Sequence, residues 1–189
     1  MAGRQRKVVV ALGAKGSGKT GGLTRPLVQR YLAGGGKVRI LDPAGEFDEL
    51  GEWPGRGNTD EWIDTLTGEG LGPRGGGWGP GLLVLDDADR YLGAGTEKHF
   101  RDLWVANRHL GLDLVVSGHR PQGLPKDLLG AADELWLFQQ DEPRALEYLA
   151  EIPALEPVFA GATHPLPKKP GMALKVLVHE RQVYLVRLF

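Results

Sequence analysis

With 189 residues, 41% of them hydrophobic, the chain is long enough for one well-buried α/β core and too short for two ordinary domains. The absence of cysteine excludes disulfides, thiolate metal ligands and cysteine nucleophiles, so any metal ion must be held by oxygen atoms. The formal net charge of −1 argues against broad, non-specific nucleic-acid binding by the outer surface, although a basic lining that faces a pore would not show in this sum.

No apolar run reaches the length of about 18 residues that a membrane-spanning helix requires. Residues 1–7 also lack the apolar core of a signal peptide. We therefore expect no transmembrane segment, and a soluble protein of the cytoplasm.

Short apolar runs separated by helix-length segments indicate an α/β fold. Such runs suit strands that are buried on both faces. Strands that alternate with helices predict a mainly parallel, doubly wound sheet with right-handed crossovers, whose ligands bind at the carboxyl ends of the strands. The predicted strands are residues 8–12, 38–41, 82–85, 112–116 and 135–138.

The segments between these strands are predicted to be helices and loops. A short helix is expected near residues 59–66, and an amphipathic helix that packs on the sheet precedes the fourth strand. The glycine-rich stretch 68–81 and the proline-rich stretch 153–171 are predicted to be loops. The apolar positions of the amphipathic helix are Phe100, Leu103, Trp104 and Leu110.

The end of the chain predicts a terminal β-hairpin formed by residues 173–179 and 183–189, although its three-residue turn lacks glycine. The whole chain, 1–189, is expected to form one domain. Its core would cover about residues 7–140, and the C-terminal loop and hairpin about residues 153–189.

A glycine-rich motif follows the first predicted strand and opens a helix-compatible segment, which is the context that a P-loop requires. Glycines allow backbone N–H groups to turn toward a phosphate chain, Lys19 can reach the β- and γ-phosphates, and the Thr20 hydroxyl can hold Mg²⁺. The motif, with Gly21 after it, predicts a site for ATP and Mg²⁺. The alternative is a glycine-rich turn that matches by accident in a chain with 29 glycines. The motif reads Gly13-Ala14-Lys15-Gly16-Ser17-Gly18-Lys19-Thr20.

The third predicted strand ends in two carboxylates, Asp86 and Asp87, as a Walker B element requires. Asp86 is expected to hold Mg²⁺ through water, opposite Thr20. Asp87 is the candidate base that orients or deprotonates the attacking water, which favours hydrolysis over phosphoryl transfer to a bound metabolite. The alternative for Asp87 is a solvated loop acid or a helix N-cap.

Two residues flank the fourth predicted strand. If this strand lies between those that carry the P-loop and Asp86, His119 at its end can donate a hydrogen bond to the γ-phosphate or to the attacking water; a histidine that merely caps a turn is the alternative. Arg108 precedes the strand, about 15–20 Å from the P-loop. It is expected to act in trans as an arginine finger, which requires a ring, or else to be a cation at a helix C-terminus.

Four segments together resemble the FtsK/HerA superfamily of DNA-pumping ATPases, over about residues 7–140. They are the P-loop, Leu41-Asp42-Pro43-Ala44-Gly45-Glu46-Phe47, residues 82–88, and residues 107–121, where an arginine and a glycine precede an apolar strand that ends in Arg-Pro. The resemblance implies a RecA-like P-loop NTPase fold of the additional-strand type. It also implies a pentameric or hexameric ring that moves double-stranded DNA through its pore at the expense of ATP.

Within this superfamily the chain is similar in size to the small genome-packaging ATPases of membrane-containing icosahedral viruses. This similarity implies genome packaging into a capsid, a location in the host-cell cytoplasm or on the virion, and docking to a capsid or membrane vertex protein. Candidate DNA contacts are Arg74 with Trp78, and Lys168 with Lys169, through sequence-independent phosphate contacts; ordinary solvated loops are the alternative.

Two positions depart from the pattern of the superfamily, which usually has glutamine where this chain has His119 and glutamate where it has Asp87. Because Asp87 is one methylene shorter, the water must lie closer, or Asp42 or Glu46 must serve as the base. The departures leave open an ATP-binding scaffold or morphogenesis protein with little turnover. A small-molecule P-loop kinase would suit the length, but the arginine-rich lid that such kinases generally need is not found.

Overall fold

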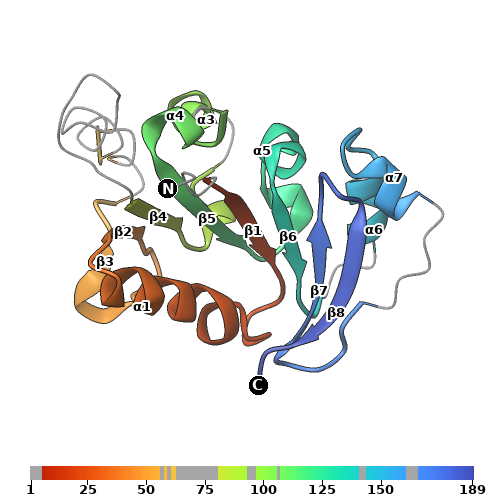
Figure 1. Cartoon of the computed structure of the whole chain (residues 1–189), viewed down its shortest axis with the longest axis horizontal. Coiled ribbons are helices and arrows are strands. Elements are labelled where there is room, and N and C mark those ends of the chain that lie inside the picture. The colour runs from red at the N-terminus through yellow and green to blue at the C-terminus, as the bar shows by residue number, and fades with distance from the viewer. Residues whose placement is uncertain are drawn as a thin grey trace.

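The computed structural model describes residues 6–55, 58, 61–62, 81–92, 97–105, 107–140, 144–160 and 166–189. Within them, an eight-stranded sheet with the order β3-β2-β4-β5-β1-β6-β7-β8 forms the centre of the molecule (Figure 1). The strands from β3 to β6 are parallel, and β7 and β8 are antiparallel to their neighbours. The strands are β1 (Val8–Leu12), β2 (Lys37–Leu41), β3 (Gly51–Glu52), β4 (Gly81–Leu85), β5 (Leu112–Gly118), β6 (Glu134–Leu137), β7 (Met172–Leu177) and β8 (Gln182–Arg187).

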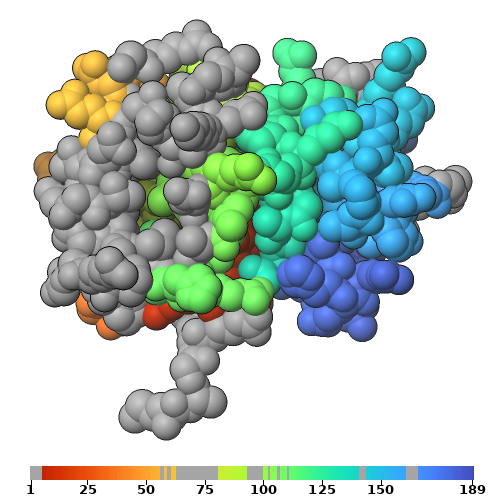
Figure 2. Space-filling view, turned by 90° about the horizontal axis from the view of Figure 1, so that it is seen from above, coloured from red at the N-terminus to blue at the C-terminus, as the bar shows by residue number. Residues whose placement is uncertain are grey.

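Helices cover both faces of the sheet. In Figure 1 helix α1 lies below the central strands, whereas α3, α4 and α5 lie above them. Figure 2 shows α5 beside α6 and α7 on the upper side. A π-helical segment, Thr20–Thr24, continues directly into α1. The helices are α1 (Arg25–Ala33), α3 (Glu97–Val105), α4 (Asn107–Leu110), α5 (Lys126–Ala131), α6 (Ala145–Ala150) and α7 (Glu156–Phe159).

The continuous apolar runs arise because each central strand is buried on both faces. Alternate side chains of β1 enter different cores: Val10 packs with the residues of the α3–α7 side, and Ala11 with those of the α1 side. The predicted fold class, a mainly parallel doubly wound sheet with a C-terminal hairpin, is confirmed. The hairpin turn manages without glycine because Arg181 adopts a φ angle of 55°.

Some elements differ from the sequence prediction. The amphipathic segment forms two helices, α3 and α4; its Phe100, Leu103 and Trp104 are buried as expected. Within the predicted loop 153–171, residues 156–159 form α7 and bury Val158 and Phe159. Most of the predicted helix 59–66 and of the loop 68–81 lies outside the described residues. Among the helices described, none is both long and apolar enough to cross a membrane.

The strand order brings the polar strand ends together. β5 lies between β4 and β1, which is the condition set above for His119. Because β1, β2, β4 and β5 are parallel, the segments that follow them emerge at the same edge of the sheet.

Candidate active site

The loop after β1 is anchored to the ends of both strands that flank β1. The Gly13 N–H donates to the carbonyl oxygen of Gly118 at the end of β5 (3.1 Å), and the Ala14 N–H donates to that of Gln139 after β6 (2.8 Å). A Cβ atom added at Gly13 would lie only 2.6 Å from Phe138 Cβ, which explains the need for glycine here. The start of the P-loop is therefore fixed by the sheet itself.

The next turn of the loop bends around a cavity of about 500 Å³ at the carboxyl edge of the sheet. Gly16 and Gly18 make this bend with φ angles of 77° and 101°, in the left-handed region that favours glycine. Six predicted P-loop positions line the cavity, whereas Gly13, Ala14 and Ser17 do not and serve to anchor the loop. The lining residues are Lys15, Gly16, Gly18, Lys19, Thr20, Gly21, Ala44, Glu46, Asp87, Arg90 and His119.

Lys19 lies inside the loop, with its ammonium group against backbone carbonyl oxygens. Its Nζ donates to Gly13 O (2.6 Å) and to Ala14 O (3.3 Å). Burial lowers the pKa of Lys19, and the negative charges of Asp87 and Asp86 oppose this effect. Charged phosphate oxygens are stronger hydrogen-bond acceptors than carbonyl oxygens. The ammonium group of Lys19 is therefore placed to exchange its carbonyl partners for the oxygens of a bound phosphate.

Asp86 is buried at the end of β4 and is held by a residue from β5. Its Oδ1 accepts a hydrogen bond from Ser117 Oγ, and the same oxygen of Ser117 accepts the Asp87 N–H (3.0 Å). Burial raises the pKa of Asp86 to about 6; the Ser117 hydrogen bond opposes this shift, and the negative charge of Asp87 adds to it. A nearby cation would offset the free-energy cost of ionising this buried carboxylate.

The donor set fits Mg²⁺. Thr20 lines the cavity, whereas Asp86 does not and is buried directly before the lining residue Asp87. A hydroxyl and a carboxylate suit Mg²⁺, which commonly binds through one or two carboxylates plus waters and substrate phosphates. In the described part of the chain, no cluster of three metal-ligating acids or histidines is found. The Ser17 hydroxyl at the base of the loop is buried and, within the described part of the chain, has no hydrogen-bond partner, although Ser17 does not line the cavity.

His119 lies between two carboxylates. Its Nδ1 is 3.2 Å from Asp89 Oδ1, and its Nε2 is 3.6 Å from Asp87 Oδ1. Asp87 adopts φ 44° and ψ 45°, a left-handed conformation that is unusual for a residue other than glycine, and its side chain makes no capping hydrogen bond. The structure thus brings both predicted residues to the cavity, in contact with each other.

The two alternative acids occupy different environments. Asp42 is buried, and its carboxylate accepts the backbone N–H groups of Ala44, Gly45 and Phe47 at 2.8–3.2 Å, so it shapes the turn after β2. Glu46 lies in that turn and lines the cavity. Of the two, Glu46 is the one that lines the cavity.

Two contributors were not assigned a role from sequence. Ser117 bridges the two Walker B residues; its signal was a polar residue at the end of an apolar strand. Arg90 lines the cavity from the same chain, with its Nη1 3.4 Å from Pro43 O. The position of Arg90, four residues after Asp86, offers no motif by itself, because its place in the site depends on how the turn after β4 folds back.

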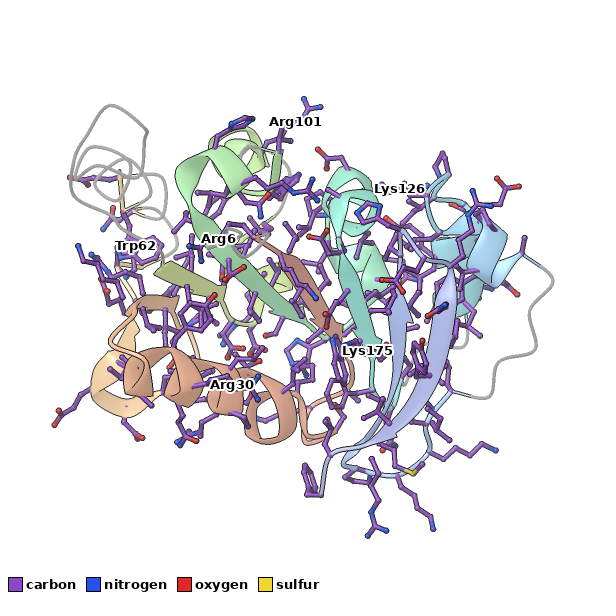
Figure 3. The ribbon with its side chains drawn as sticks, in the orientation of Figure 1. Arg6, Arg30, Trp62, Arg101, Lys126 and Lys175 are labelled. Atoms are coloured by element: carbon purple, nitrogen blue, oxygen red, sulfur yellow. The ribbon has the colours of Figure 1, made fainter. Side chains whose placement is uncertain are left out.

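Arg108 does not line this cavity. It lies in the last turn of α4, 53% exposed, and its Nη2 is 3.2 Å from Asp133 Oδ1. This amino-terminal edge of the sheet carries further ion pairs, including Arg6 with Asp113 (3.3 Å) and Lys175 with Glu134 (3.0 Å), whose cations are labelled in Figure 3. Arg108 precedes β5, at the opposite edge of the sheet from the P-loop, and its action in trans stays a prediction.

The candidate DNA contacts are only partly described. Arg74 and Trp78 lie outside the described residues. Lys168 and Lys169 are exposed and precede Gly171, whose N–H donates to the P-loop carbonyl of Ser17 (3.1 Å).

No sequence-family profile matches the chain, and no curated protein matches it in sequence. Solved structures match in fold. The genome-packaging NTPase B204 of Sulfolobus turreted icosahedral virus 2, in complex with AMPPCP, superposes with a TM-score of 0.76 at 20% identity, covering 97% of this chain and 98% of that chain.

Two secretion ATPases match as well. The cytoplasmic domain of the type VII secretion ATPase EccC of Thermomonospora curvata gives a TM-score of 0.66 at 14% identity, covering 97% of this chain and 24% of that chain. EssC (ATPases 2 and 3) of Geobacillus thermodenitrificans gives 0.67 at 12% identity, covering 97% and 39%. The chain therefore has the P-loop NTPase fold of B204, EccC and EssC, and its predicted resemblance to the FtsK/HerA superfamily is confirmed at the level of the fold.

Proposed function

We propose that this protein is an ATPase that assembles into a ring and couples ATP hydrolysis to the translocation of double-stranded DNA, in viral genome packaging. The main support for ATPase activity is that residues from four strand ends line one cavity. The P-loop follows β1, and Glu46, Asp87 and His119 follow β2, β4 and β5. The structural match to B204, which covers nearly the whole length of both chains, supports the packaging role.

In this proposal the backbone N–H groups of residues 16–20 and Lys19 hold the phosphates of ATP. Thr20 and Asp86 hold Mg²⁺, which when bound neutralises charge on the phosphate oxygens. Ser117 fixes the carboxylate of Asp86 through its hydrogen bond.

In hydrolysis a water oxygen bonds to the γ-phosphorus and loses a proton, while the bond from that phosphorus to the β–γ bridging oxygen breaks and ADP leaves. Asp87, or Glu46, which also lines the cavity, accepts that proton. Asp89 accepts a hydrogen bond from Nδ1–H of His119 and so orients the ring, with Nε2 directed toward Asp87. With Nδ1–H given to Asp89, Nε2 donates to the γ-phosphate or the water only in the imidazolium form, in which both ring nitrogens carry a proton. Arg90 supplies positive charge from the same chain.

The ring is supported by the position of Arg108. It is half exposed at the sheet edge that faces away from the cavity, where a neighbouring subunit could receive it, and its ion pair with Asp133 is open to solvent. In a ring, Arg108 would act on the nucleotide of the next subunit, and DNA would pass through the central pore. The ring would dock on a capsid or membrane vertex protein, in the host-cell cytoplasm or on the virion.

The experiment that tests this function measures steady-state ATP hydrolysis against protein concentration, with and without duplex DNA. We expect a rate per subunit that rises with concentration and with DNA, that collapses in Lys19→Ala, and that falls on the order of 10³-fold in Arg108→Ala. Arg101→Ala is the matched control, since Arg101 is also exposed and paired with a carboxylate (Asp127, 3.1 Å).

Other results would favour other functions. A rate independent of concentration and DNA, lost only in Lys19→Ala, would contradict the ring motor. Transfer of phosphate to a metabolite would indicate a kinase, and tight ATP binding with negligible turnover in the presence of DNA would indicate a scaffold.

A further inference from the structure

The C-terminal hairpin is tied directly to the P-loop. The Gly171 N–H, just before β7, donates to Ser17 O (3.1 Å), and the Leu188 N–H, just after β8, donates to Gly171 O (2.8 Å). These bonds bring Phe189 against the loop, and Figure 1 shows the C-terminus next to the segment that leads from β1 into α1. The hairpin therefore forms one side of the P-loop.

The ring of Phe189 lies close against glycine backbone on both of these segments. A Cβ atom added at Gly18 would lie 3.0 Å from Phe189 Cζ, one at Gly22 3.0 Å from Cε1, and one at Gly171 2.6 Å from Cε2. Yet the residue is 64% exposed. Phe189 therefore contacts the loop through its ring and still leaves much of its surface open to solvent.

Three glycines lie where the P-loop passes into the following helix: Gly18 just before the π-helical turn Thr20–Thr24, and Gly21 and Gly22 within it. Gly18 has a positive φ and Gly22 lies under Phe189, so both have a reason to lack a side chain. Gly21 has neither: a Cβ atom there would meet nothing within 4 Å, and glycine costs helix stability. It lines the cavity, so a ligand on its surface would account for the missing side chain.

We propose that Phe189 and the adjoining glycine backbone of residues 18–22 form the subsite for the base of a bound nucleoside triphosphate. The inference rests on the proposed function, because it takes the phosphates to lie at residues 16–20. Phe189 does not itself line the cavity, but it adjoins Gly18, which does, so a base that extends beyond the phosphates can reach the ring by leaving the cavity on the Gly18–Gly21 side. An aromatic ring offers a base its flat face and no hydrogen-bond partner, so it favours any purine over a bare phosphate chain without distinguishing adenine from guanine.

The test compares the binding of ATP, GTP and inorganic tripolyphosphate by isothermal titration calorimetry. Phe189→Ala is expected to weaken ATP and GTP binding by roughly 5- to 100-fold and to leave tripolyphosphate binding unchanged, because only the nucleotides have a base to stack. Phe189→Tyr keeps the ring and should retain the affinity. Leu185→Ala is the matched control, since Leu185 is a similarly exposed apolar residue (60%) of the same hairpin.

If the aromatic ring of Phe189 only supports the P-loop, the same measurements give different results. Equal loss of ATP and tripolyphosphate in Phe189→Ala would show that the ring only supports the loop. Full recovery of ATP affinity in Phe189→Leu would show that apolar packing suffices. Either result, or no effect of Phe189→Ala, overturns the base subsite. A wild-type protein that binds neither ATP nor tripolyphosphate, or whose binding survives Lys19→Ala, would instead refute the proposed function.

Discussion

Asp86 should destabilise the protein at neutral pH when no cation is bound. Its side chain is 1% exposed, and Ser117 Oγ donates a hydrogen bond to it. Burial raises its pKa to about 6 from an ordinary value of 3.8, and the charge of Asp87 adds to the effect. At 1.36 kcal/mol per pH unit, this difference corresponds to about 3 kcal/mol of unfolding free energy.

The sign follows from proton binding. Between about pH 4 and pH 6 the folded chain binds the Asp86 proton more tightly than the unfolded chain does, so stability falls as the pH rises through this window. The penalty is absent below about pH 4 and complete above about pH 6. Asp86→Asn keeps an oxygen acceptor for Ser117 and carries no charge. It should match the wild type near pH 4 and exceed it by up to about 3 kcal/mol at pH 7.

Urea unfolding at a series of pH values from about 4 to 8, without nucleotide or divalent cation, measures this difference. Asp48→Asn is the control, since its carboxylate is 83% exposed and its loss should change stability little at any pH. Added Mg²⁺ and ATP should narrow the gap, because a cation stabilises the charged form in the wild type alone. A gap that does not vary with pH, or a variant less stable than wild type at pH 7, would refute the reasoning.

Two further predictions concern stability. Gly21→Ala should raise the free energy of unfolding by about 0.5–1 kcal/mol, because the added methyl group meets no atom within 4 Å. Gly22→Ala should not raise it, because its methyl group would press on the side chains of Leu188 and Phe189. Thermal melts of the two variants and the wild type compare their stabilities. Ser117→Ala should cost about 1–3 kcal/mol in urea unfolding at neutral pH, since it removes the donor to Asp86 and the acceptor of the Asp87 N–H, and Ser117→Thr, which keeps the hydroxyl, should recover part of that loss.

The sequence was most informative for strands that are long enough to show a run of apolar residues. The apolar runs predicted five strands, because burial on both faces favours apolar side chains. The charged exceptions, Arg39 in β2 and Asp113 in β5, form ion pairs with Glu52 and Arg6. It missed β3, because a strand of two residues, Gly51 and Glu52, has no periodicity. It took residues 156–159 for loop because of nearby prolines, but Pro157 lies in the first turn of α7, where its missing N–H costs nothing.

Within the site, the P-loop and the two Walker B acids were predictable because their spacing is local. The arrangement of Arg90, Ser117 and Glu46 was not, because it depends on how turns from three strands converge. The same limit explains Asp42. Its type suited a catalytic base, but the turn after β2 commits its oxygens to backbone N–H groups.

The anchoring of the P-loop also bears on the order in which the chain folds. Gly13, Ala14 and Ser17 are bound by Gly118, Gln139 and Gly171, all of which are synthesised long after the loop. A nascent chain that has emerged through residue 110 contains the whole motif and none of these partners. Because contacts so distant in sequence form late and slowly, the ability to hold phosphate should appear only when almost the entire chain has left the ribosome.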